Sequence, residues 1–102
     1  MKRIQKGDGK HPEPGQKVYV RYHARLQDGA EFYNCFEKRK PNKFTIGKEE
    51  VITGFEQAVL QMSTGEIAWV YVPNALAYGQ RAVGSIPPFA NLWYKIEVVK
   101  ID

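Results

Sequence analysis

The sequence predicts an α+β fold in which an antiparallel sheet of about five strands packs against one short helix. Several segments alternate apolar and polar residues with a period of two, the pattern of half-buried strands, and one segment has the spacing of an amphipathic helix. With 102 residues, of which 43% are hydrophobic, the chain can supply one modest core. We therefore expect residues 1–102 to form one domain, which can belong to a longer chain.

Five segments are predicted to be strands. Residues 18–26 alternate between two sets of side chains with a period of two, which predicts a strand. Asp28-Gly29 then predicts a hairpin turn, and Phe32 opens the return strand. Residues 44–46 form a short strand that ends at Gly47. The apolar run 67–72, rich in β-branched and aromatic residues, predicts a central strand, and the alternation over residues 92–99 predicts the last one.

The helix is expected near residues 53–62, where Phe55, Ala58, Val59 and Met62 follow one another at helical spacing. Turn residues fill the segment 7–15 and leave no room there for a regular element. The basic segment 37–43 contains a proline and is predicted to be an exposed loop, with a nucleic-acid patch as the alternative. Residues 74–89 form a long loop, a kind of loop that is usually functional.

Composition and motifs exclude several kinds of chemistry. The net charge of +4 is mild, and Cys35 is the single cysteine, so the fold cannot depend on an internal disulfide. No apolar run is long enough to span a membrane, and we expect a cytoplasmic domain. No phosphate-binding loop or zinc spacing occurs, and no third group orients a Cys35–His23 pair for nucleophilic catalysis. We expect no metal and no cofactor.

The chain carries more aromatic residues than a core of this size needs: 5 Phe, 6 Tyr and 2 Trp. This surplus suggests an aromatic-lined cavity, with ordinary core filling as the alternative. Since no covalent, metal or phosphate chemistry is indicated, a pocket is the functional feature that the sequence favours.

Several short blocks in order resemble the FKBP family, the FK506-binding peptidyl-prolyl isomerases. The family's helix motif, V-I-x-G-W-E-x-x-x-x-x-M-x-x-G-E, is matched by Val51-Ile52-x-Gly54-Phe55-Glu56-x-Ala58-x-x-x-Met62-x-x-Gly65-Glu66. Later blocks are Ala77-Tyr78-Gly79, Ile86-Pro87-Pro88 and Asn91-Leu92-x-Tyr94. The match runs from about residue 4 to residue 102. It implies a strongly twisted antiparallel sheet curled around one short helix.

The resemblance also implies an activity and a set of site residues. It implies a peptidyl-prolyl cis-trans isomerase that binds X–Pro segments in an aromatic pocket. The implied catalytic residues are Tyr22, Phe32, Phe55, Tyr78 and Tyr94. The implied substrate-binding residues are Tyr33, Val51, Ile52 and Ile86, with the backbone N–H of Ile52 holding a substrate carbonyl.

The sequence departs from the family pattern at several pocket positions. Tyr33 stands where the family places an aspartate, Asn42 replaces a pocket-wall aromatic residue, and Phe55 replaces a tryptophan. The loop from Tyr78 to Pro87 is one residue shorter. We therefore expect an isomerase of reduced activity, with a catalytically weak protein-binding, chaperone or scaffold module as the alternative.

These departures also limit the expected partners. We expect a monomer that binds proline-containing peptides or proteins and binds FK506-like macrolides weakly. Nucleic acid and membranes are not expected as partners, and a patch formed by Lys38, Arg39 and Lys40 is the remote alternative.

Overall fold

The computed structural model describes residues 1–34, 41–84 and 86–102, and for residues 32–34 it describes the backbone alone. Within these residues the chain forms one α-helix, a short 3-10 helix and six strands. In chain order they are β1 (Lys2–Gln5), β2 (Lys17–Leu26), β3 (Glu31–Asn34), β4 (Asn42–Thr45), α1 (Thr53–Leu60), β5 (Ile67–Val72), η1 (Asn74–Leu76) and β6 (Leu92–Ile101).

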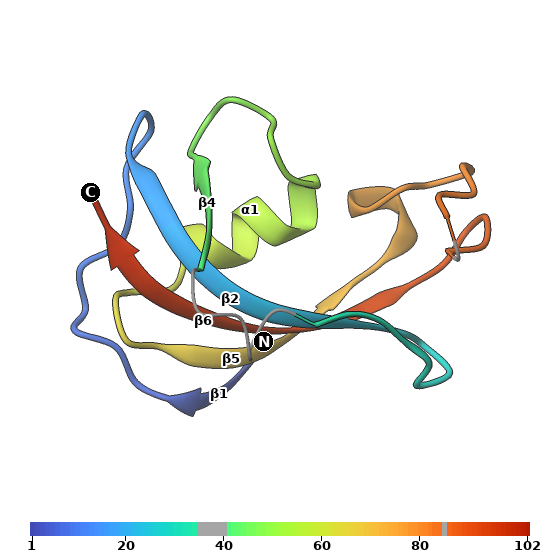
Figure 1. The fold of residues 1–102 in the computed structure, drawn as a ribbon, viewed down its shortest axis with the longest axis horizontal. Coiled ribbons are helices and arrows are strands. Elements are labelled where there is room, and N and C mark those ends of the chain that lie inside the picture. Colours follow the sequence, from blue (N-terminus) through green and yellow to red (C-terminus); the bar gives the residue numbers. More distant parts are fainter. Residues whose placement is uncertain (35–40, 85) are drawn as a thin grey trace.

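The strands form one antiparallel sheet in the order β1-β5-β6-β2-β3 (Figure 1). The long strands β2 and β6 are paired from Val18↔Ile101 to Leu26↔Leu92. The other edge of β2 is shared, because β4 pairs with its first half and β3 with its second half. The predicted antiparallel sheet with one helix is confirmed.

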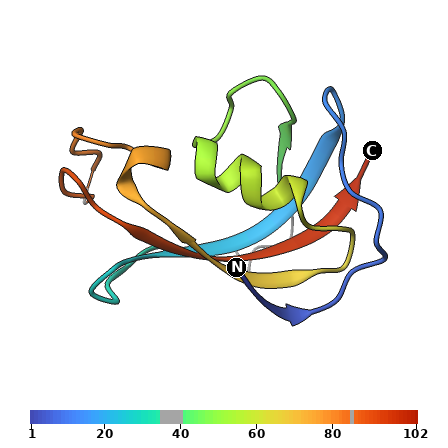
Figure 2. The same ribbon diagram turned by 180° about the vertical axis from the view of Figure 1, so that it is seen from behind.

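Helix α1 lies across one face of the sheet, as both views show (Figures 1 and 2). Its apolar stripe points at the sheet, and Phe55, Ala58 and Val59 are buried. The strands meet it with alternate residues, so that Leu92, Ile96 and Val98 of β6 are fully buried while their neighbours are not. Gly54 lets the helix approach β5 closely, because a Cβ atom there would collide with Val72.

Strand β1 was not among the elements expected from the sequence. All four of its residues are exposed, so it lacks the alternation that reveals a half-buried strand. It is held by pairing with β5, by the ion pair of Arg3 Nε with Glu66 Oε2 at 2.9 Å, and by a hydrogen bond from Gln5 to the carbonyl of Gly65. Glu66 is almost fully buried, and its carboxylate interacts with both Arg3 and the backbone N–H of Ser63.

Other element boundaries differ from those expected. Asn42 and Lys43, placed in the exposed loop 37–43, belong to strand β4 because their backbones pair with Val20 and Tyr19. Residues 37–40 of that loop lie outside the described residues. Ile46, expected in the strand, follows it and is buried. The central position of β5, between β1 and β6, is as predicted.

Among the described residues, no helix has both the length and the apolar character needed to cross a membrane.

Candidate functional site

Four aromatic rings meet where α1 crosses the sheet. The ring of Phe55, on the first turn of α1, has its centre 4.9 Å from Tyr22, 5.3 Å from Tyr94 and 5.7 Å from Phe44. The rings of Tyr22 and Tyr94 are 5.8 Å apart. These three contacts of Phe55 are edge-on, an arrangement that adds roughly 0.5–1.5 kcal/mol per pair beyond burial. We call these four residues the inner ring cluster.

A cavity of about 370 Å³ opens beside the inner ring cluster. Its walls come from β2, β4 and the segment that leads into α1, and its lining residues are Val20, Tyr22, Asn42, Lys43, Phe44, Glu50, Val51 and Phe55. The turn between β4 and α1 is held by two carboxylates that accept backbone N–H groups, Glu50 from Thr45 and Glu56 from Gly47, both at 3.0 Å. The cavity therefore combines aromatic walls with a polar border.

Tyr94 contacts two of these rings but does not line the cavity. Burial of its hydroxyl raises the pKa of Tyr94, and neighbouring Tyr78 and Tyr22 raise it further. A hydrogen bond with Tyr78 acts in the same direction. This bond connects the loop that follows η1 to the inner ring cluster.

The remaining residues of the predicted site lie at different distances from the cavity. Val51 lines it directly. Ile52 caps α1 with extended backbone angles, and its carbonyl accepts the N–H groups of Phe55 and Glu56. Ile86 is buried and belongs to the core cluster against which Tyr22, Ile52 and Tyr78 pack. Phe32 and Tyr33 lie on β3, where Tyr33 pairs with Ala24, and their side chains are outside the described part of the chain.

The structure thus brings Tyr22, Phe55, Tyr78, Tyr94 and Val51 together, and it adds residues that the sequence did not indicate. Phe44 was assigned only to a strand, and Glu50 only to the start of the helix. The surplus of aromatic residues was the one signal that pointed to Phe44, and it did not specify which aromatic residues would meet.

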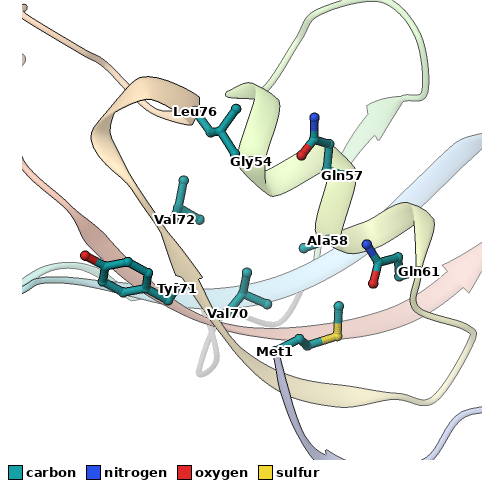
Figure 3. Close-up of a pocket in the computed structure, with 9 residues that line it drawn as sticks. All are labelled: Met1, Gly54, Gln57, Ala58, Gln61, Val70, Tyr71, Val72 and Leu76. Carbon is teal, nitrogen blue, oxygen red and sulfur yellow. The ribbon is translucent and has the colours of Figure 1, made fainter.

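A second hollow lies on the other side of α1 (Figure 3). It is smaller, about 170 Å³, and Tyr71 is the single aromatic residue among its described lining residues. Figure 3 shows Gln57 and Gln61 of α1 on one side of it and Val70 and Val72 of β5 on the other. Because it is smaller and lacks a group of packed rings, we take the cavity at the inner ring cluster as the candidate site.

Within residues 1–34, 41–84 and 86–102, no three His, Cys, Asp or Glu side chains gather as a metal site would require.

Comparison with known proteins matches nearly the whole chain. Residues 8–99 match the family described as FKBP-type peptidyl-prolyl cis-trans isomerase. The chain is 43% identical to the peptidyl-prolyl cis-trans isomerase Fkbp12 of Drosophila melanogaster over 101 residues, which covers 97% of this chain and 94% of that protein. It is 40% identical to the peptidyl-prolyl cis-trans isomerase FKBP1A of Xenopus laevis, with the same coverage of both chains.

A solved structure supports the same grouping. The crystal structure of FkpA from Escherichia coli superposes with a TM-score of 0.88 at 29% sequence identity and covers 98% of this chain. The chain spans 46%, about half, of that protein.

Proposed function

Since the chain belongs to the FKBP-type peptidyl-prolyl cis-trans isomerase family, and is an enzyme of that class, we propose that it binds its X–Pro segment in the cavity at the inner ring cluster. The observation that supports this site is the packing of Tyr22, Phe55 and Tyr94 around one point at the start of α1. The proline ring would rest against Tyr22 and Phe55, which line the cavity.

The reaction needs little more than such a cavity. Rotation about a peptide bond is opposed by roughly 18–20 kcal/mol, because twisting removes amide resonance. The two isomers of an X–Pro bond differ by only about 0.5–1 kcal/mol, so lowering the barrier is the whole task of the catalyst. A twisted amide is less polar than a planar one, and a site that excludes water therefore favours the transition state over the ground state.

Two polar groups can orient the peptide. Ile52 lies before the first helical residue, so its N–H is outside the ladder of α1 and can donate to a substrate carbonyl. The Tyr78 hydroxyl shares a hydrogen bond with Tyr94 and, as both donor and acceptor, would donate to a second carbonyl. Phe32, Tyr33, Val51 and Ile86 complete the proposed site, with Val51 and Ile86 as apolar walls.

We propose further that the activity is reduced. Tyr33 lies at the position of the family's aspartate, and the cavity wall contains Asn42 in place of an aromatic residue. The second candidate function, a protein-binding, chaperone or scaffold module with little turnover, rests on the same two positions. Weak binding of FK506-like macrolides, a monomeric state and a cytoplasmic location are part of this proposal.

A prolyl-isomerisation assay on a chromogenic tetrapeptide tests both candidates. We expect a measurable rate, lower than that of the Drosophila relative assayed side by side, and lower still for Tyr22→Ala. Peptide binding without any rate above the uncatalysed background would favour the scaffold. A rate equal to that of the relative would contradict the proposed reduction, and a Tyr22→Ala variant of full activity would contradict the proposed site.

A further inference from the structure

The face of the sheet that is turned away from α1 carries a second group of aromatic residues. Trp69 and Tyr71 of β5 and Trp93 of β6 occupy the positions between the buried ones, and Figure 3 shows Val70 and Val72 pointing toward α1 instead. The ring centres of Tyr71 and Trp93 are 5.0 Å apart, and those of Trp69 and Trp93 are 6.5 Å apart. Tyr71 and Trp93 are 39% and 38% exposed. Contiguous exposed aromatic groups of this kind mark interaction sites.

Basic side chains accompany these rings across the sheet. Arg25 pairs with Trp93, which pairs with Tyr71. In the next rung, Lys95 pairs with Trp69, which pairs with Lys2. The Arg25 guanidinium lies 5.4 Å from the centre of the Trp69 ring, within the range of a cation–π contact. We call Lys2, Arg25, Trp69, Tyr71, Trp93 and Lys95 the outer aromatic patch.

Two acidic residues in the described part of the chain lie near the patch. Glu97, one rung further along, lies 4.0 Å from Arg21. Glu31 lies 3.9 Å from His23 and is also the strand partner of Arg25, so it borders the patch at that end. The patch itself contains three basic residues and no acidic one, on a chain with a net charge of +4. Its ligand should therefore carry negative charge and present flat or apolar groups to the rings.

We propose that the outer aromatic patch binds single-stranded nucleic acid. Bases would stack on the exposed rings of Trp93 and Tyr71, and the phosphates would be neutralised by Arg25, Lys95 and Lys2. The sequence led us to expect no nucleic-acid partner, and its remote alternative lay at Lys38, Arg39 and Lys40. The patch consists of other residues, and it exists only where strands β1, β2, β5 and β6 are paired. Lys38, Arg39 and Lys40 lie outside the described residues.

Other occupants fit the patch less well. In a symmetric dimer each copy would present the same cations to the other, which opposes the pairing of two identical patches. An acidic peptide that adds a strand needs a free sheet edge, but Trp69 and Trp93 each lie on a strand paired on both sides. Stacked bases need neither a second identical patch nor a free sheet edge, because every base offers a flat face.

The test uses a short fluorescein-labelled oligothymidylate and the matching oligouridylate as probes, measured by anisotropy at several salt concentrations. We expect binding by the natural chain that weakens as salt rises, with quenching of tryptophan fluorescence. Trp93→Ala should weaken binding about tenfold. Arg25→Gln with Lys95→Gln should lower the dependence of log K on log salt by about one for each cation removed.

Matched controls separate the patch from general effects. Phe89→Ala removes an aromatic residue that is 61% exposed outside the patch, and Lys48→Gln removes an exposed cation on the turn before α1. Both should bind like the natural chain. Circular dichroism and prolyl-isomerase rates should be unchanged in the patch variants. If Trp93→Ala does not fold, the charge variants still decide the question.

Three results would overturn the proposal. The first is no salt-dependent binding by the natural chain, and the second is binding that the patch variants leave intact. The third is tighter, patch-dependent binding of a labelled oligoglutamate peptide, which would assign the surface to acidic proteins. The oligothymidylate and oligouridylate arms distinguish DNA from RNA as the source of the strand.

Discussion

Tyr94 and Trp93 are neighbours on β6, yet they belong to two very different aromatic groups. Tyr94 points into the inner ring cluster and is 4% exposed, whereas Trp93 points to the outer aromatic patch and is 38% exposed. Helix α1 covers the inner face of the sheet, and no described element covers the outer face (Figures 1 and 2). Aromatic side chains therefore form a buried cluster beside a cavity on one face and a partly exposed, charged surface on the other.

Burial also controls the charge state of a polar group on each face. On the inner face, burial raises the pKa of the Tyr94 phenol, and its hydrogen bond to Tyr78 acts in the same direction. On the outer face, His23 lies edge-on to Trp69 at 5.1 Å, and burial lowers the pKa of its imidazole. In both cases the neutral form is favoured, because transfer out of water penalises the charged form.

The largest effect is expected at Phe55, the centre of the inner ring cluster. Phe55→Ala should lower the free energy of unfolding by about 3–5 kcal/mol, because a buried ring that contacts three others is removed. Urea denaturation measures this directly. Phe55→Leu is the control, since it keeps most of the apolar volume and should lose markedly less. An alanine variant of full stability would show that α1 is not anchored through this ring.

A smaller effect on ligand binding is expected at Tyr33. Tyr33→Asp should make the free energy of macrolide binding more favourable, and lower the activation free energy of turnover, by an amount on the order of 1–2 kcal/mol. The reason is that a carboxylate accepts stronger, charge-assisted hydrogen bonds than a phenol. Titration calorimetry and the isomerase assay measure the two changes. Tyr33→Asn is the control, because asparagine has the size of aspartate without its charge, and this variant should give little gain. Tight binding and fast turnover by the natural chain would contradict this interpretation of Tyr33.

The matching change on the outer face is Trp93→Ala, with an expected loss of about 1 kcal/mol of stability. Because Trp93 is partly exposed, most of the lost stability should come from its ring contacts with Tyr71 and Trp69, and less from lost apolar burial. The same urea experiment, run beside Phe55→Ala, compares the two faces. A loss as large as that of Phe55→Ala would mean that the outer aromatic patch serves mainly to stabilise the sheet.

The smallest expected effect is a pH dependence that originates at His23. Burial, Arg25 and Lys95 lower the pKa of His23 below 6.5, and Glu31 opposes them in part. The unfolded chain then binds the proton more tightly, so stability is complete above about pH 6.5 and falls as the pH drops from there toward the lowered folded value. Thermal melts of the natural chain and His23→Gln between pH 5 and 8 should differ in slope. Identical slopes would show that His23 is not responsible.

The sequence by itself determined the fold class and pointed to several residues of the candidate site. The period of two in residues 18–26 and 92–99 decides which side chains turn inward, and the stripe of Phe55, Ala58 and Val59 decides how α1 faces them. The same alternation places the side chains of Tyr94 and Trp93 on opposite faces of the sheet. Order and spacing of the blocks around Phe55 and Tyr78 then indicated the family.

Only the tertiary structure decided which distant residues meet. β1 became a strand through its pairing with β5 and the ion pair of Arg3 with Glu66, neither of which leaves a periodic signal in residues 2–5. Phe44 reaches Phe55, and Arg25 reaches Trp69, because strand register sets neighbours across the sheet. Periodicity is a local property of the chain, whereas contact between residues far apart in sequence depends on the order and pairing of strands, and that is where both aromatic groups arise.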